Sequence, residues 1–291
     1  MDLPVVKDSL GYPLVPASSV KGALKTRCAR AEQAEFRQGT ISCTKKGENC
    51  PKGSFCCCLF GGEVGDGAKG SGVLSVLDLT PVAFPVASAD KGFVYVAPKS
   101  LLARAAALMA AVGSSDYANF FTHLSQSPYT ATGVGFTGSV YLFTSPVKLD
   151  TIKVDGDASF LDRLSKFLGD IHPLASSIKE RLVILDDSIA SKIVDRALLR
   201  ITRVRLDRNT KTVVRGGVWT EEYIPQATVF VSAVIATGYT NEFCEKCNHC
   251  SDAKSCLYKA VNRLGLDQGL PVFVGGKETV GKGLIVFKPL H

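Results

Sequence analysis

Apolar positions recur along the chain with two different spacings. Residues 73–79, with apolar side chains at five of seven positions, predict a buried strand, and residues 82–96 contain further strand-like runs. Pro98 can open a helix, and the Ala- and Leu-rich residues 99–112 that follow it predict a core-facing one. Residues 255–264 predict another helix. The sequence therefore predicts both helices and strands, and we expect an α+β fold.

The second half of the chain is dominated by runs typical of strands. Residues 181–237 hold alternating apolar positions, and the polar stretch 207–211 at their centre predicts the turn of a β-hairpin. Residues 113–140, rich in Ser, Thr and Gly, predict a loop region. No repeat or low-complexity tract divides the chain, so we expect a single domain over residues 1–291, interrupted by insertions.

A Pro-punctuated segment near the N-terminus leads directly into a helix. Its prolines disfavour helical backbone in the residues before them, so the helix is expected after Ala17, with Ser18 or Ser19 as the N-cap. Lys21 and Lys25 then share one helix face. Free N–H groups, serine hydroxyls and a lysine one turn in can bind phosphate. An amphipathic helix with solvated lysines is the other interpretation.

A glycine-rich segment near the C-terminus offers a second place for a ligand to approach the backbone. Four glycines lack Cβ atoms and two lysines add charge: Gly275, Gly276, Lys277, Gly281, Lys282 and Gly283. A tight turn between two strands uses the same residues, so the spacing alone leaves both interpretations open.

The chain has ten cysteines, and all of them except Cys28 fall into two groups. The first group is Cys43, Cys50, Cys56, Cys57 and Cys58, and the second is Cys244, Cys247, Cys250 and Cys256. Both lie among Lys, Gly, Asn and Ser, so they belong to loops. Thiolates clustered in a loop are typical of structural zinc, with the second group as the stronger candidate; paired disulfides and an iron–sulfur cluster are the alternatives.

Charge and histidine content narrow the function classes only a little. Lys and Arg exceed Asp and Glu by 34 to 27, and the formal net charge of +7 permits an RNA partner without demonstrating one. The four histidines form no recognisable pair, which disfavours histidine-pair ribonuclease chemistry. No apolar run approaches the roughly 18 residues of a membrane span, and no signal peptide is evident. We therefore expect a cytoplasmic protein that has no membrane partner.

Four motifs, in order along the chain, resemble those of one family. Residues 11–25 resemble the "G-x-P-x-I-P-G-S-S-L-K-G-x-L-R" segment of the RAMP superfamily of CRISPR RNA-binding proteins, and residues 275–286 resemble its C-terminal glycine-rich loop and last strand. Residues 72–96 and 203–225 are similar to the fourth Cmr subunit of type III-B systems. Because the motifs cover most of the chain, their joint occurrence is far more specific than any one of them.

The resemblance implies an RRM-like (ferredoxin-like) palm with an antiparallel sheet, insertions at about 41–70 and 241–256, and a β-hairpin thumb at about 198–227. The thumb would wedge into the guide–target duplex. Guide CRISPR RNA, target RNA, other copies of the chain in a filament and other Cmr subunits are the implied partners. The implied RNA contacts are Ser18, Ser19, Lys21, Lys25, Arg203, Arg205, Lys211, Trp219 and the glycine-rich segment from Gly275 to Gly283.

The resemblance also implies an endoribonuclease that cuts target RNA at regular intervals. The substrate's 2′-hydroxyl can act as nucleophile, so a positioned carboxylate and a divalent ion, Mg²⁺ or Mn²⁺, suffice. The family's catalytic residue is an aspartate in an Asp-x-Pro pattern ahead of the Gly-x-Pro segment, which Asp2 matches. Asp8, closer to that segment, is the second choice. Glu221, Glu222 and Tyr223 match a segment proposed to approach the same bond.

Many superfamily members carry a zinc-binding finger where the first cysteine group lies. The implied ligands there are Cys43, Cys50, Cys56 and Cys58, although spacing does not distinguish among Cys56, Cys57 and Cys58. Neither zinc site is expected to be catalytic, because a four-cysteine shell leaves no open position. An RRM-like palm begins with a central strand that a chain starting at Asp2 lacks, so we expect an upstream segment of roughly 20 residues.

Two other functions fit the same resemblance. One is a structural backbone subunit with an inactive site, and the other is a ribonuclease that processes guide precursors. The middle motifs and the lack of a histidine pair disfavour the processing enzyme. Metal-dependent cutting of target RNA at regular intervals separates the active from the inactive backbone subunit.

Overall fold

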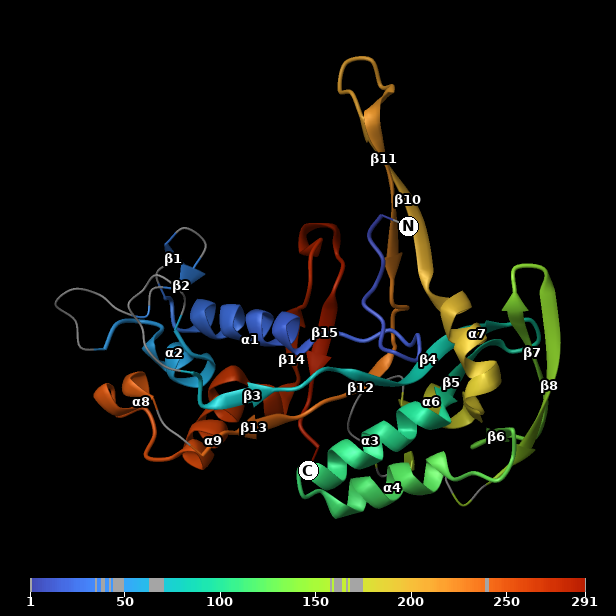
Figure 1. The fold of residues 1–291 in the computed structure, drawn as a ribbon, viewed down its shortest axis with the longest axis horizontal. Helices are drawn as coiled ribbons and strands as arrows, with labels where there is room; N and C mark the ends of the chain where they lie inside the picture. Colours follow the sequence, from blue (N-terminus) through green and yellow to red (C-terminus); the bar gives the residue numbers. More distant parts are fainter. Residues whose placement is uncertain are drawn as a thin grey trace. The chain divides into compact units, whose positions relative to one another are not determined.

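The computed structural model describes residues 2–34, 36–37, 40–41, 43, 50–62, 71–157, 159, 164–165, 167, 175–238 and 241–290. They form two compact units (Figure 1): unit 1 consists of Met1–Leu14 and Leu79–Val231, and unit 2 of Val15–Asp78 and Ser232–His291. Each unit has helices and strands, which confirms the mixed α+β class. The single domain over 1–291 stays a prediction. Within the described ranges, no helix combines the length and apolar character needed to cross a membrane.

Unit 1 is built around a seven-stranded sheet in the order β12-β4-β5-β9-β6-β8-β7. Its strands are β4 (Thr80–Ser88), β5 (Gly92–Pro98), β6 (Ala131–Gly133), β7 (Gly138–Ser145), β8 (Lys148–Gly156), β9 (Leu182–Leu185) and β12 (Val229–Val231). The predicted antiparallel sheet is wrong for two pairs, since β5 with β9 and β6 with β8 run parallel. The β5–β9 pair is parallel because the chain crosses over through helices between these strands. An extra pairing of Ser88 with Leu142 joins β4 to β7, which makes the sheet barrel-like.

Among the described residues, four helices accompany this sheet: α3 (Lys99–Ala111), α4 (Ser115–Ser125), α6 (Ala175–Arg181) and α7 (Asp187–Ala197). Helix α3 begins directly after Pro98, as the sequence predicts. The loop predicted over 113–140 is wrong for α4, because Ala118, Phe121 and Leu124 recur at helical spacing and are buried. The strand-like interpretation of 181–237 is likewise wrong for α7, which buries Ile193 and its neighbours.

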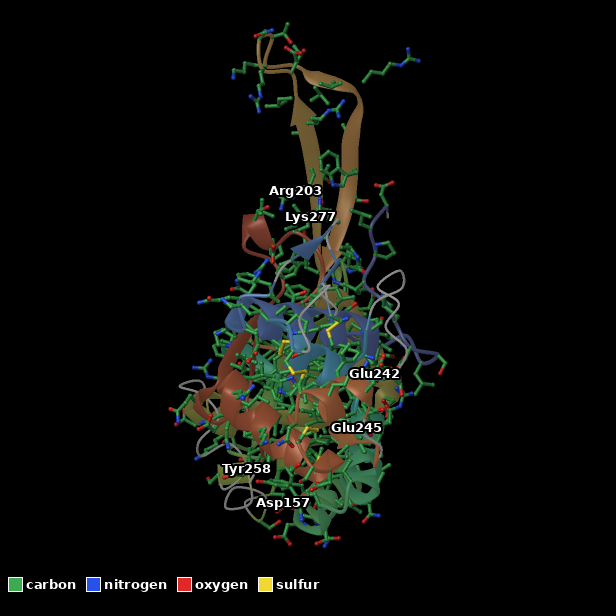
Figure 2. The ribbon with its side chains drawn as sticks, turned by 90° about the vertical axis from the view of Figure 1, so that its left-hand side faces the viewer. Asp157, Arg203, Glu242, Glu245, Tyr258 and Lys277 are labelled. Atoms are coloured by element: carbon green, nitrogen blue, oxygen red, sulfur yellow. A yellow bond between two sulfur atoms is a disulfide. The ribbon has the colours of Figure 1, made fainter. Side chains whose placement is uncertain are left out.

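A separate β-hairpin consists of β10 (Leu199–Leu206) and β11 (Val213–Tyr223). It extends away from the rest of unit 1 (Figure 1), and Arg203 lies along it below the tip (Figure 2). Asp207 fixes the turn, because its Oδ1 accepts hydrogen bonds from the backbone N–H groups of Asn209 and Thr210, both at 2.9 Å. The predicted hairpin is therefore confirmed.

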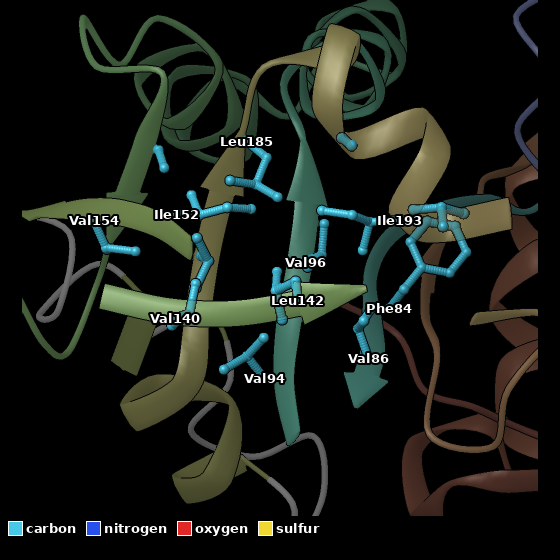
Figure 3. Close-up of a cluster of buried hydrophobic side chains, with 14 of the residues drawn as sticks. Phe84, Val86, Val94, Val96, Val140, Leu142, Ile152, Val154, Leu185 and Ile193 are labelled. Atoms are coloured by element: carbon cyan, nitrogen blue, oxygen red, sulfur yellow. The ribbon is translucent and has the colours of Figure 1, made fainter. Parts of the chain in front are cut away.

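The core of unit 1 lies against the sheet (Figure 3). Phe84 and Val96 from neighbouring strands and Ile193 from α7 are each fully buried there. Tyr12, from the N-terminal segment, belongs to the same cluster, and its hydroxyl donates to Asp187 Oδ1 at 2.6 Å. Burial, together with the neighbouring Asp187, raises the pKa of Tyr12 above its ordinary range. The N-terminal segment is thus anchored in the core.

Unit 2 combines short helices with two-stranded sheets. Its helices are α1 (Ala17–Ala31), α2 (Ser54–Phe60), α8 (Glu242–Lys246), α9 (Ala253–Leu264) and the 3₁₀ turns η1 (Leu266–Gln268) and η2 (Glu278–Val280). Its paired strands are β1 (Phe36–Arg37) with β2 (Thr40–Ile41), β3 (Leu74–Val76) with β13 (Val234–Ala236), and β14 (Leu270–Phe273) with β15 (Leu284–Phe287). Helix α9 confirms the helix predicted over 255–264, and Asp252 caps it by accepting from the Ser255 N–H.

Candidate catalytic residues and nucleic-acid interface

The first residues of the chain lie along β11. The N–H of Leu3 donates to the carbonyl of Thr220 at 3.1 Å, and the N–H of Glu222 donates to the carbonyl of Leu3 at 2.9 Å. Leu3 and Glu221 form a parallel bridge. This pairing brings Asp2 next to Thr220, although 218 positions separate them in the sequence.

Asp2 has an exposed but positioned carboxylate. Its Oδ2 accepts hydrogen bonds from the backbone N–H of Thr220 at 2.7 Å and from the Thr220 hydroxyl at 2.9 Å. These two bonds, the backbone one first, hold the pKa of Asp2 below its ordinary value. The group is therefore ionised at neutral pH, accessible to a ligand and restrained, as a general base or metal ligand must be.

Asp8 has different surroundings. Its Oδ1 accepts from the N–H groups of Leu10 at 2.8 Å and Tyr12 at 2.9 Å, and its Oδ2 accepts a short hydrogen bond from Arg104. The side chain is only 12% exposed. Asp8 thus holds the turn that leads into the Gly-Tyr-Pro motif.

Glu221 is the centre of a buried network at the base of the hairpin and is 2% exposed. Its Oε1 accepts from Trp219 Nε1 at 2.7 Å, and its Oε2 accepts from Arg203 Nε at 3.1 Å and from the Tyr223 hydroxyl. Three donors therefore occupy this carboxylate. The arrangement stabilises the hairpin and leaves Glu221 little capacity to take a substrate proton.

Glu222 is engaged in the same way by other partners. Its Oε1 accepts from Arg200 Nε at 3.0 Å and its Oε2 from the N–H of Val5 at 3.3 Å. Arg200 also contacts Asp195 at 2.9 Å, and Asp195 contacts Lys7 at 2.8 Å. Glu222 thus links the N-terminal segment to the hairpin, and Asp2 is the most accessible of the predicted carboxylates.

The predicted RNA contacts on the hairpin divide into two kinds. Arg203 and Trp219 face each other across the strands and both bind Glu221, while Arg205 and Lys211 are exposed farther along. Large apolar side chains are exposed beside them: Leu199, Val204, Leu206, Val213 and Val218. Exposed apolar groups beside cations suit a surface that packs on bases and holds phosphates.

Helix α1 begins at Ala17, two or three residues earlier than a cap at Ser18 or Ser19 would place it. Pro16 occupies the N-cap position, and the N–H of Ala17 donates to Asp78 Oδ1 at 2.6 Å. The prediction of a Ser18 or Ser19 cap is therefore wrong, because Asp78, remote in sequence, satisfies that donor. Ser18 is left exposed in the first turn.

A hollow of about 450 Å³ lies between α1 and the start of the glycine-rich loop in unit 2. Its polar lining comes from Ser18, Ser19, Thr26, Arg27, Arg30 and Glu278, and Gly275 also borders it. The hollow is thus bordered by two motifs that the resemblance implies as RNA contacts. Arg27 and Arg30 were missed, although their spacing of three residues on an expected helix already placed them on one face.

The two predicted lysines of α1 do not share an exposed face. Lys21 is half-buried, and Lys25 is only 9% exposed and lies next to the buried Leu24. The two lysines are one turn apart on the same side of α1, but the buried stripe of the helix includes position 25, so Lys25 is not exposed there.

The glycine-rich loop connects β14 to β15. Gly275, Gly281 and Gly283 have φ values of 85°, 73° and 79°, which favour glycine. A Cβ on Gly283 would lie 2.2 Å from the carbonyl oxygen of Val274, whereas one on Gly276 would meet open space. Lys277, at φ 69°, and Lys282 belong to the same turn. The glycines therefore build a strand turn, and its open side leaves the backbone near Gly276 accessible.

All the cysteines of the structure are paired. The disulfides, yellow in Figure 2 where visible, are Cys28–Cys56, Cys43–Cys57, Cys50–Cys247, Cys58–Cys244 and Cys250–Cys256. Neither predicted ligand set is assembled. In α2, Cys56, Cys57 and Cys58 point about 100° apart and so reach three different partners. Cys58 instead joins Cys244, Cys250 and Cys256, with one sulfur from each within 4.8 Å of the others, and this cluster could hold a metal ion.

Comparisons with known proteins support the sequence resemblance. A family model described as the RAMP superfamily matches residues 1–286. The chain is 25% identical to the "CRISPR system CMR subunit Cmr4" of Saccharolobus solfataricus, covering 100% of this chain and 89% of that protein. It is also 25% identical to the "CRISPR system Cmr endoribonuclease Cmr4" of Pyrococcus furiosus, covering 98% and 86%.

Solved structures show the same fold. A chain of the type III-B Cmr-beta complex bound to cognate target RNA matches with a TM-score of 0.69 and 21% identity, over 97% of this chain and 86% of that one. Oligomeric Cmr4 from Pyrococcus furiosus matches with a TM-score of 0.61 and 21% identity, over 98% and 90%.

Proposed function

Because the chain belongs to the RAMP superfamily, we propose that it is a guide-RNA-binding backbone subunit of a type III-B (Cmr) CRISPR effector complex and that it cleaves complementary target RNA. The observation that carries the proposal is the likeness to Cmr4 proteins over essentially the whole chain. One of these relatives is named an endoribonuclease, and one structural neighbour was solved with target RNA.

The mixed sheet of unit 1 is the palm in this proposal, and the β10–β11 hairpin is the thumb. The hairpin's exposed apolar side chains, such as Val204 and Val218, would pack against unstacked bases, and Arg205 and Lys211 would hold phosphates. The buried network around Glu221 keeps the base of the hairpin rigid, so that its tip is presented in a fixed direction.

The guide backbone would bind at the hollow beside α1. Arg27 and Arg30 supply charge, Ser18 and Ser19 supply hydroxyls, and the accessible backbone near Gly276 adds donors. These groups recognise phosphate and not bases. Sequence specificity therefore comes from guide pairing.

Cleavage would use Asp2. The carboxylate is held through Oδ2 by Thr220, so Oδ1 is the oxygen that would accept the proton of the substrate's 2′-hydroxyl or bind a cation. An exposed carboxylate oxygen suits Mg²⁺ or Mn²⁺, and a bound ion of this kind would stabilise the negative charge that develops on the phosphate. Asp8, Glu221 and Glu222 would keep the loop and hairpin in place around it.

The proposed partners are guide RNA, target RNA, other Cmr subunits and further copies of this chain in a filament. The oligomeric crystal form of one relative supports self-assembly. We place the complex in the cytoplasm, where transcripts are available. The cysteine cluster takes no part in cleavage, because four thiolates leave a metal no open position; zinc is the metal that we propose for it.

The test is reconstitution of the chain with guide RNA and the other Cmr subunits, followed by incubation with labelled target RNA. We expect cleavage only when the target is complementary to the guide and Mg²⁺ or Mn²⁺ is present, with loss of cleavage on chelation. Binding of the complementary target without any cleavage would instead identify an inactive backbone subunit. Cleavage of guide precursor by the chain alone would contradict the proposal.

A further inference from the structure

A closed set of polar contacts fastens the N-terminal segment to the base of the hairpin. Lys7 Nζ lies 2.8 Å from Asp195 Oδ1, and Arg200 Nη2 lies 2.9 Å from Asp195 Oδ2. Arg200 Nε donates to Glu222 Oε1 at 3.0 Å, and Glu222 Oε2 accepts from the N–H of Val5 at 3.3 Å. The contacts thus leave the segment at Lys7 and return to it at Val5, and we call these five residues the charged ring.

Asp195 is the member of the ring at which the elements meet. It lies in the last turn of α7, which leads directly into β10 (Figure 1). Arg200, on β10, stands opposite Glu222 on β11. One oxygen of Asp195 therefore binds the N-terminal segment, and the other binds the hairpin. Burial raises the pKa of Asp195, but the hydrogen bonds and charges of Lys7 and Arg200 outweigh it and hold this pKa below its ordinary value.

The end of the segment that carries Asp2 buries little apolar surface. Leu3 is 49% exposed and Val6 is 52% exposed, whereas Tyr12, at the other end of the segment, is 2% exposed. The described contacts of residues 2–7 are mainly polar: the backbone pairing of Leu3 with β11, the bonds of Asp2 with Thr220, and the charged ring. A short pairing with little apolar burial opens readily by itself, so the ring decides how firmly Asp2 is held.

We propose that Asp195 is a positioning residue for target cleavage, which acts through Lys7 and Arg200 to fix the segment that carries Asp2 on the base of the hairpin. The proposal rests on the function proposed above. The hairpin and Asp2 then move as one body, so the place at which the hairpin enters the guide–target duplex also determines which bond Asp2 reaches. Because displacement of a reacting group by about 1 Å can cost about 100-fold in rate, a loosened segment should cut more slowly and less precisely.

Asp195→Asn is the variant that tests this role. An amide has one acceptor oxygen, so it cannot serve Lys7 and Arg200 together. In the full chain assembled with guide RNA and the other Cmr subunits, single-turnover cleavage should fall by about tenfold, and bonds next to the normal cut should also be cleaved. Affinity for the target and the melting temperature should change little, because half-exposed ion pairs contribute little to global stability.

Three further variants separate positioning from a general effect of charge. Asp195→Glu keeps both acceptor oxygens and should recover the rate and the single cut position. Lys7→Gln combined with Asp195→Asn should be no slower than Asp195→Asn alone, because Lys7 acts through Asp195. Asp186→Asn is the matched control: Asp186 lies at the other end of α7 and pairs with Lys99 at 2.5 Å, so its loss should leave rate and cut position unchanged.

A second measurement is independent of cleavage. Amide hydrogen exchange of the N-terminal peptide, followed by mass spectrometry on the full chain, reports how often the Leu3 and Val5 N–H groups leave their acceptors. Exchange over residues 2–7 should be faster in Asp195→Asn and unchanged in Asp186→Asn. If the unmodified complex does not cut at all, the proposed function fails, and this measurement still decides whether the ring holds the segment.

Two outcomes would overturn the proposal. Exchange over residues 2–7 that is the same in Asp195→Asn as in the unmodified chain would show that the ring does not hold the segment. Cleavage by Asp195→Asn at the normal rate and position, or an equal loss in Asp186→Asn, would show that Asp195 does not position Asp2.

Discussion

Asp2 and Asp8 carry the same functional group only six positions apart, yet their surroundings differ. Asp8 is mostly buried and receives two backbone N–H groups and Arg104. Asp2 is exposed, and its Oδ2 accepts two hydrogen bonds from Thr220. A carboxylate that must accept a proton or bind a cation needs a free, accessible oxygen, so the difference favours Asp2.

Replacing Asp2 with Asn should separate cleavage from binding. The amide keeps an acceptor for Thr220 but loses the charge that binds a cation or accepts a proton, so cleavage should fall by about 100-fold or more. Guide and target affinity should barely change, because many cationic and backbone contacts carry binding. A single-turnover assay with the assembled complex measures the cleavage rate, and filter binding measures the affinities for guide and target.

Asp8→Asn is the matched control for that experiment. Its side-chain oxygen can still accept from Leu10 and Tyr12, so cleavage should stay largely intact. If Asp8→Asn is inactive while Asp2→Asn cuts normally, the assignment of the two residues is reversed.

Thr220 is a positioning residue in this account, because it acts through Asp2. Thr220→Ala removes one of the two bonds to Asp2 Oδ2, and the pKa of Asp2 rises toward its ordinary value, which is still far below neutral pH. A loss of cleavage at neutral pH therefore reports displacement and not protonation. We expect a loss of about tenfold at unchanged affinity, and recovery in Thr220→Ser, which keeps the hydroxyl. Failure of Thr220→Ser to recover activity would contradict this role.

Variants of helix α1 can test the proposed contribution of its arginines to guide binding. Arg27 and Arg30 are exposed and line the hollow, whereas Lys25 is buried in the helix stripe. Each of Arg27→Ala and Arg30→Ala should weaken guide binding for every guide sequence and lower the slope of log K against log salt by about 0.7 for a single-stranded phosphate contact. Binding titrations over a range of salt concentrations give this slope.

Lys25→Ala serves as the comparison for α1. Because Lys25 is buried, its removal should lower the melting temperature of the chain and leave the salt slope near that of the unmodified protein. A decrease in slope of about 0.7 in Lys25→Ala, with no change in Arg27→Ala, would place the guide on another face of the helix.

The glycines of the β14–β15 turn should differ in their tolerance of a side chain. Gly283→Ala forces a Cβ to within 2.2 Å of the Val274 carbonyl at a positive φ, so we expect a destabilisation of about 1–3 kcal/mol and weaker guide binding. Gly276→Ala meets no protein atom and should leave the melting temperature unchanged. Thermal unfolding of both variants checks the difference, and equal melting temperatures would contradict the turn geometry.

The sequence predicted elements where one local signal dominated. Pro98 marks the start of α3, and the polar residues around Asp207 mark the hairpin turn. Helix α4 was missed because the Ser, Thr and Gly residues of 113–140 obscure a buried stripe that includes Phe121 and Leu124. The surroundings of the site could not be predicted, because they depend on strand register: Glu221 meets Arg203 only once β10 and β11 pair. The same holds for Cys58, whose partners come from the other end of the sequence.

In the proposed account, the groups for cleavage and those for guide binding belong to different units of the chain. Asp2 and the hairpin belong to unit 1, and the hollow beside α1 and the glycine-rich loop belong to unit 2. A filament of identical copies along one guide would repeat Asp2 at a fixed interval. The regularity of cleavage would then be a direct result of the assembly, and guide sequence would have no part in it.

Mapping the cut positions on a long complementary target tests this account most directly. Complexes assembled on one guide, either with the unmodified chain or with Asp2→Asn, are incubated with end-labelled target and Mg²⁺, and the products are resolved to single nucleotides. The account predicts cuts at one constant spacing whose positions are independent of target sequence, and loss of every cut together in Asp2→Asn. Irregular cuts that follow target sequence, or a regular ladder that persists in Asp2→Asn, would contradict it.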